Sequence, residues 1–192
     1  LGGRPIPGDV KYKDIHGDNI IDSNDQCAIG YTREPELVFG FGGTIEYKGF
    51  DLSAYFTGAA RTSTFFEDRT FWPFASGMGF FNVFKEIYDN RWTPETAGAA
   101  KYPVVTDGFN VQSMRRSTVW QKDASYLRLK NLEVGYTLPK KVVSKLKINN
   151  LRVFVNGTNL YTWDKINHTI DPESDNWYPI QRAVNFGLAV DF

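Results

Sequence analysis

The sequence predicts an all-β fold of antiparallel strands joined by loops of very unequal length. Aromatic residues make up 16% of the chain although its mean hydropathy is −0.38, so large rings stand among polar groups. The 17 glycines and 9 prolines would interrupt long helices. Several segments also alternate apolar and polar residues at every second position, which is the period of a strand with two different faces.

The first two predicted strands form a hairpin over residues 36–58. Apolar side chains alternate with small or polar ones from Leu37 to Tyr47, and the pattern resumes at Phe50. The residues between them, Lys48-Gly49, predict a very short turn.

Three further strands are predicted within residues 119–192, at 124–138, 150–161 and 181–192. The last is the clearest, with apolar residues at Val184, Phe186, Leu188, Val190 and Phe192. In 124–138 the apolar phase slips by one residue between Leu129 and Leu132. A slip of one residue turns side chains to the other face, so we expect a β-bulge near Lys130-Asn131 that restores the phase.

Long loops separate the predicted strands at one end only. Residues 1–35, 59–118 and 163–179 are long, whereas 48–49 and 139–150 are short. Outer-membrane barrels have this arrangement, and their strands need roughly 9–11 residues to cross the bilayer. Five strands cannot close such a barrel, so the chain would be a segment of a larger wall. A soluble β-sandwich, which buries its apolar faces in a core, fits the same alternation, and the pattern alone leaves both interpretations open.

Charge and composition exclude other classes of protein. The 22 Lys and Arg balance 22 Asp and Glu, so no basic surface for nucleic acid is expected. The single cysteine, Cys27, cannot form an internal disulfide, and with only two histidines a Cys/His zinc site is excluded. We expect Cys27 to be a small buried residue. No catalytic motif is found, so an enzyme is not predicted.

Short motifs along nearly the whole chain resemble the C-terminal part of SusC/RagA-type TonB-dependent transporters. In family order they are Pro7-Gly8-Asp9-Val10-Lys11-Tyr12-Lys13-Asp14, Tyr47-Lys48-Gly49-Phe50-Asp51-Leu52-Ser53, Arg91-Trp92-Thr93-Pro94-Glu95, Ser125-Tyr126-Leu127-Arg128-Leu129-Lys130-Asn131-Leu132, Gly135-Tyr136-Thr137-Leu138-Pro139, Asn159-Leu160-Tyr161-Thr162-Trp163 and Asp171-Pro172-Glu173. The resemblance implies a transmembrane β-barrel segment, the last five strands of a barrel of about 22 strands that encloses a plug. Residues 36–58 and 119–192 would be wall, and 1–35 and 59–118 extracellular loops.

The resemblance also implies a function and partners. The protein would take up oligosaccharides or peptides through the outer membrane of a Gram-negative, Bacteroidetes-like cell. Its partners would be the remainder of the barrel and plug, a SusD-like surface lipoprotein, TonB and membrane lipid. The alternative is a soluble carbohydrate-binding β-sandwich with a calcium-stapled loop; a polysaccharide-cleaving enzyme would need two facing carboxylates.

An acidic segment from Asp14 to Asp25 has the spacing of an EF-hand calcium loop. The oxygen ligands would come from Asp14, Asp18, the Ile20 carbonyl, Asp22 and Asp25. His16 falls at a ligand position where calcium prefers oxygen, and Asn19 stands where such loops have glycine. The alternative is an acidic turn that binds no metal.

The segment from Phe65 to Trp92 is rich in aromatic rings, and a short helix is predicted over residues 79–91, with Phe80, Phe81 and Phe84 on one face. The rings either form the small core of a long loop or stack on a glycan or peptide, in which case Trp72 and Trp92 are the candidate contacts. In the last strand the pattern Asn185, Gly187, Val190, Phe192 resembles the signal that the barrel-assembly machinery reads.

Overall fold

The chain divides into two compact units. The computed structural model describes residues 4–67, 71–75, 82–144, 148–166, 170–173, 178 and 180–192. One unit, called the sheet unit below, comprises Tyr31–Ser63 and Asp123–Phe192; the other, the loop unit, comprises Leu1–Gly30 and Thr64–Lys122. Each is described by itself.

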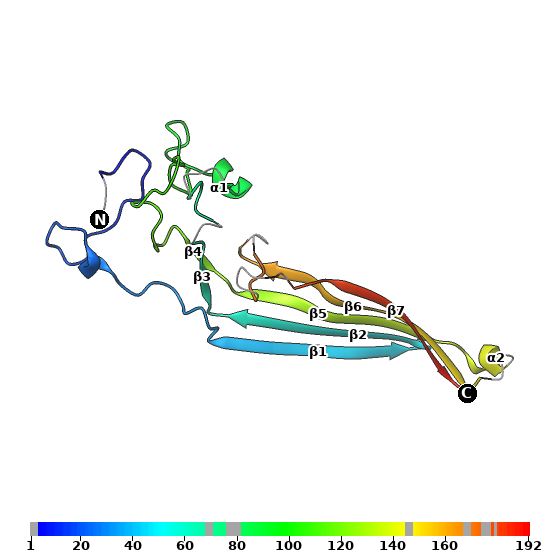
Figure 1. Cartoon of the computed structure of the whole chain (residues 1–192). Coiled ribbons are helices and arrows are strands. Elements are labelled where there is room, and N and C mark those ends of the chain that lie inside the picture. The colour runs from blue at the N-terminus through cyan, green and yellow to red at the C-terminus, as the bar shows by residue number, and fades with distance from the viewer. Residues whose placement is uncertain are drawn as a thin grey trace. The chain divides into compact units, whose positions relative to one another are not determined.

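The sheet unit is built on one antiparallel sheet of five strands in the order β1-β2-β5-β6-β7 (Figure 1). The strands are β1 (Leu37–Tyr47), β2 (Phe50–Ala60), β5 (Tyr126–Thr137), β6 (Asn150–Asp164) and β7 (Ala183–Asp191). All five predicted strands are therefore confirmed, and β6 runs three residues further than expected. Within the described residues β1 and β7 each pair on one side only, so they are the two edges of the sheet.

The connections at one end of the strands are short, as predicted. Lys48 and Gly49 both have positive φ, 49° and 87°, which two-residue hairpin turns of type I′ require. The Thr137 amide donates a hydrogen bond of 2.7 Å to the Gly49 carbonyl, which fixes this turn beside the end of β5. β5 and β6 are joined through one turn of helix, α2 (Lys140–Val143).

The predicted β-bulge is confirmed in β5. Leu129 pairs with Phe56 of β2, and Leu132 pairs with Ala54, so Lys130 is the extra residue that the register with β2 skips between Leu129 and Asn131. The register with β6 is irregular at the same place. Because paired residues share a face, Leu129 and Leu132 both lie on the apolar side of the sheet. The bulge thus keeps one face apolar along the whole strand.

The two faces of the sheet differ in chemistry. On the face we call apolar, one row across the five strands is Ile45, Leu52, Val134, Val155 and Phe186. These side chains are exposed, with Ile45 at 69% and Phe186 at 82%. The adjacent row on the opposite, polar face is Thr44, Ser53, Glu133, Asn156 and Asn185.

The loop unit has a small core of its own. Its buried apolar side chains are Phe66, Phe71, Ile87, Tyr102, Met114 and Trp120. Regular structure there is brief: a 3-10 turn η1 (Ser23–Asp25) and a helix α1 (Lys85–Asp89). The short strands β3 (Ser63–Phe65) and β4 (Gln121–Asp123), which the sequence did not predict, pair with each other. Ser63 and Asp123 belong to the sheet unit, and the other four residues belong to the loop unit.

Two expectations need correction. The predicted helix over 79–91 is shorter, since α1 begins at Lys85, and Phe80 and Phe81 lie outside the described residues. Cys27 is exposed and not buried. It lies in a stretch without regular structure, so no strand or helix turns it toward a core.

No helix in the described part of the chain is long and apolar enough to cross a membrane.

Candidate functional site

The carboxylates of the acidic segment cap backbone amides of their own turns. Asp14 accepts hydrogen bonds from the amides of Gly17 (2.5 Å) and Asn19 (2.8 Å). Asp25 accepts from the amides of Ile15 (2.8 Å) and Asp22 (2.9 Å), and also from His16. These amides hold the pKa of the Asp25 carboxyl below its usual range.

The other two predicted acidic ligands are used in the same way. Asp18 accepts from the amide of Ile20, and Asp22 caps η1 through the amide of Asn24. Among the described residues no three acidic, histidine or cysteine side chains converge into a group that could hold a metal ion. A cation here would have to compete with amide donors for the same oxygens, so the calcium site stays a prediction.

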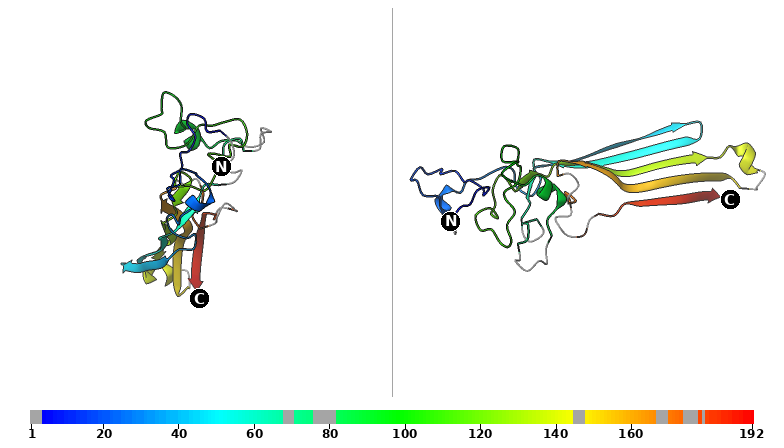
Figure 2. Two further views of the ribbon diagram at one scale, coloured as in Figure 1. Left: turned by 90° about the vertical axis from the view of Figure 1, so that its left-hand side faces the viewer. Right: turned by 90° about the horizontal axis from the view of Figure 1, so that it is seen from above.

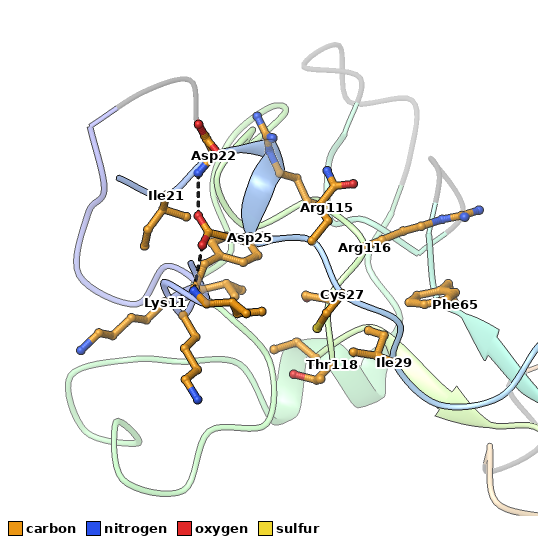
Figure 3. Close-up of a pocket in the computed structure, with 17 residues that line it drawn as sticks. Lys11, Ile21, Asp22, Asp25, Cys27, Ile29, Phe65, Arg115, Arg116 and Thr118 are labelled. Atoms are coloured by element: carbon orange, nitrogen blue, oxygen red, sulfur yellow. Dashed lines mark hydrogen bonds between the residues drawn. The ribbon is translucent and has the colours of Figure 1, made fainter. Parts of the chain in front are cut away.

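A cavity of about 850 Å³ lies in the loop unit beside the acidic segment (Figure 3). Asp22 and Asp25 line it together with Cys27 and Phe65, which come from the two separate stretches of this unit. Arg116, which also lines it, pairs with Glu67 through two hydrogen bonds of 2.6 and 2.7 Å, and its guanidinium lies 5.2 Å from the centre of the Phe65 ring. The arginine therefore stabilises the wall of the cavity.

Several described aromatic rings of the loop unit pack on one another. Phe66 stacks on Phe71 at 4.5 Å, and Phe71 stacks on Phe84 at 5.3 Å between ring centres. Trp120 is 0% exposed, and its indole N–H donates to the Ser113 carbonyl at 2.7 Å. Of the two interpretations of these rings, the small core is the one that this packing supports.

The two tryptophans predicted as contact residues have different surroundings. Trp72 is half-buried and meets Phe109 edge-on, with ring centres 5.6 Å apart. Trp92 covers Gly8, where an added Cβ atom would come within 2.5 Å of the indole ring. Gly8 has φ of 92°, so both its conformation and the tryptophan above it require glycine. Trp92 thus holds the Pro7-Gly8 turn in place.

A hydrogen-bonded link that the sequence did not reveal joins the two stretches of the loop unit. The Asp9 carboxylate accepts from the Asn110 amide group (2.7 Å), the Ser113 hydroxyl (2.9 Å) and the Ile6 backbone amide (2.8 Å). Partial burial raises the pKa of Asp9, but these three donors together lower it below the usual value. The only sequence signal was Asp9 in the Pro-Gly-Asp motif, because its two side-chain partners, Asn110 and Ser113, lie about a hundred residues away.

The polar face of the sheet carries an ion pair across three strands. Arg152 of β6 donates to Asp51 of β2 and, at 2.7 Å, to Glu133 of β5. Between them Gly135 provides the space, because a Cβ atom there would collide with the guanidinium and with the Asp51 carboxylate. The network continues through Asn156 to Asn185 of β7.

The residues that resemble the assembly signal lie along β7 and just after it. Asn185 and Gly187 are on the polar face, and the ring of Phe154 covers Gly187. Val190 is on the apolar face, and Phe192 follows the strand with its side chain exposed. The four residues therefore belong to an edge strand that has one side free for pairing in the described structure.

A second ion pair lies at the other end of the polar face. Arg128 of β5 is 1% exposed and contacts Asp171 and Glu173 in the segment that follows β6. Both carboxylates contact this one arginine.

Comparison with protein-family models gives no match. Among curated proteins, TonB-dependent receptor P26 of Formosa agariphila is 31% identical over 97% of this chain, and TonB-dependent receptor P3 of the same organism is 28% identical over 100%. The chain spans only 20% and 18% of the lengths of these two relatives.

Solved structures similar to this chain include the RagAB peptide importer, which also matches over only part of its own length. The RagAB peptide importer matches in its open-open state with a TM-score of 0.67 and 26% identity, over 90% of this chain and 19% of that one. In its closed-closed state the TM-score is 0.70 and the identity 27%, over 97% and 21%. All of these relatives are named as receptors or importers, which is consistent with a chain that is not an enzyme.

Proposed function

We propose, on the resemblance to SusC/RagA-type TonB-dependent transporters that these comparisons confirm, that this chain supplies wall and external loops to an outer-membrane nutrient importer. The observation that carries the proposal is the exposed apolar face of the five-stranded sheet. Large apolar side chains such as Phe186 at 82% and Leu188 at 71% exposure stand in a continuous band. Lipid is the solvent in which such a band is stable.

The two unpaired edges of the sheet are a second argument for a closed barrel. In hydrocarbon every backbone amide and carbonyl must be bonded, so β1 and β7 cannot remain edges there. Further strands would pair with both, and a closed barrel of about 22 strands is the architecture of large plugged transporters. The short turn at Lys48-Gly49 and the connection through α2 lie at the same end of the strands (Figure 1). By analogy with other such barrels that end faces the periplasm.

The cargo and partners are inferred from the relatives. RagAB is named as a peptide importer, which favours peptide over oligosaccharide as the imported class for this chain. We infer a SusD-like surface lipoprotein as partner and energy supply from TonB through a plug formed by other residues.

The β-sandwich alternative predicted that the apolar residues of these strands pack between two sheets. Instead Leu37, Ile45, Val153, Phe186, Leu188 and Val190 are exposed, and Phe39 is half-buried. The second sheet in the described structure is the short β3–β4 pair, which cannot cover five strands.

The decisive experiment compares two neighbouring residues of β7 in the full-length protein in lipid. In a Cys27→Ser background, Leu188→Cys and Ala189→Cys are each labelled with a nitroxide. We expect the label at 188, on the apolar face, to be more accessible to oxygen than to a water-soluble nickel complex, because oxygen concentrates in lipid. The label at 189, on the polar face, should show the reverse. A label at 188 that neither reagent reaches would place this side chain in a protein core and contradict the proposal.

A further inference from the structure

A buried arginine holds the segment that follows β6 against the polar face of the sheet unit. Arg128 pairs in register with Thr57 of β2 and Thr162 of β6, so its side chain projects from the polar face. Its guanidinium lies 2.7 Å from Asp171 and 3.1 Å from Glu173, measured between nitrogen and oxygen. The Arg128 side chain is 1% exposed and that of Asp171 is 14% exposed, so their contact is shielded from water. Glu173 is 39% exposed and closes the pair on the outer side.

A hydrogen bond within the turn from Asp171 to Glu173 holds both carboxylates near the same cation. The Asp171 oxygen that binds Arg128 also accepts the backbone amide of Glu173 at 2.9 Å. Pro172 between them fixes its own φ and stiffens the turn. The ring of Tyr126 also lies beside Arg128, with its centre 5.5 Å from the guanidinium carbon.

Removing one partner of a buried ion pair leaves the other charge uncompensated, which is far more costly than losing an exposed pair. The position of residues 170–173 is therefore coupled to Arg128. We propose that Arg128 is a positioning residue that fastens this segment, residues 170–173, over the polar face near the long-loop end of the sheet.

This inference rests on the proposed function for its consequence, because the polar face would line the interior of the importer. The fastened segment then narrows the outer part of that interior. Glu173, whose side chain is 39% exposed, keeps part of that side chain accessible there. Cargo that passes along this wall would contact residues 170–173 before it contacts the strands beneath them.

The test uses trypsin on the full-length protein in outer-membrane vesicles without substrate. Lys165 and Arg182 are trypsin sites that flank the segment. We expect Arg128→Met to increase cleavage at these sites at least tenfold, because the segment loses its anchor. Lys130→Met, at the bulge of the same strand, is the matched control and should leave cleavage unchanged. The resistance of the folded barrel to heating in SDS is measured in parallel and should be the same in all three proteins.

Arg128→Lys separates position from charge. A lysine keeps the cation but cannot contact both carboxylates with a planar fork, so cleavage should fall between those of wild type and Arg128→Met. The proposal is overturned if Arg128→Met is cleaved as slowly as wild type, or if Arg128→Lys is cleaved as fast as Arg128→Met. It is also overturned if Arg128→Met lowers the heat resistance of the whole barrel to the same extent as it speeds cleavage. Import is not read in this assay, so a failure of the proposed function would appear in the nitroxide experiment and not here.

Discussion

Single glycines on the polar face show how closely side chains approach the strands. Gly135 lies under the contact between Arg152 and Asp51, and its missing Cβ lets an ion pair span the strand between them. Gly43 of β1, on the apolar face, faces open space in the described structure: an added Cβ would meet nothing within 4 Å. The same substitution therefore has opposite consequences at the two positions.

We predict that Gly135→Ala destabilises the folded barrel by about 1–3 kcal/mol, because the new methyl group displaces Arg152 from Asp51. Gly43→Ala is the matched control and should be neutral or slightly stabilising, since it only restricts the unfolded chain. The measurement is the urea midpoint of each full-length variant refolded in lipid. Equal midpoints for the two variants would contradict the role assigned to Gly135.

Asp9 gives the loop unit a dependence on pH. Its pKa in the folded protein lies below the model-peptide value of 3.8, so its contribution to stability is complete above that value and is lost as pH falls through the folded pKa. We expect the protection of residues 110–114 against pepsin to fall more steeply with acid in wild type than in Asp9→Asn, which keeps the shape without the charge. Asp107→Asn, an exposed control, should follow the wild type. An Asp9→Asn profile identical to wild type would contradict this linkage.

At the scale of elements, alternation was enough to predict the strands and the bulge. Both depend on side-chain phase, and the slip between Leu129 and Leu132 is visible in the sequence without any knowledge of partners. Contacts between distant elements could not be predicted in this way. Arg128 and Asp171 are 43 residues apart, and nothing local in either stretch indicates that they meet. β3 and β4 were missed for a similar reason, since three residues are too few to show a period.

The acidic segment has the spacing of a calcium loop, but its carboxylates accept hydrogen bonds from backbone amides. The spacing from Asp14 to Asp25 predicts calcium, while the side chains cap amides. Terbium can serve as a luminescent probe of a calcium site. We predict that terbium binds to this segment and that added Ca²⁺ displaces it and lowers its luminescence. The double variant Asp18→Ala with Asp22→Ala should weaken terbium binding at least tenfold. Asp107→Ala is the control. Unchanged terbium binding in the double variant would leave the segment as a turn stabilised by its own carboxylates.

At the scale of the whole molecule, the two faces of the sheet predict opposite tolerance to charge. Leu132 and Asn131 are neighbours in β5 that point to the apolar and polar faces. We expect Leu132→Lys to reduce the free energy of unfolding in lipid by about 2–4 kcal/mol, because the ammonium would enter hydrocarbon near the middle of the bilayer. Asn131→Lys should change it little. Comparable losses in both variants would argue against a lipid-facing sheet.

The two edges of the sheet also determine how these residues would behave outside their normal surroundings. β1 and β7 each present a row of backbone groups without a strand beside them in the described structure. A polypeptide cut to this length and made in water would find the missing neighbours in other copies of itself, and stacking of copies edge to edge leads to fibrils. Expression of this segment alone would then yield aggregates, even if the same strands are stable beside further strands in lipid.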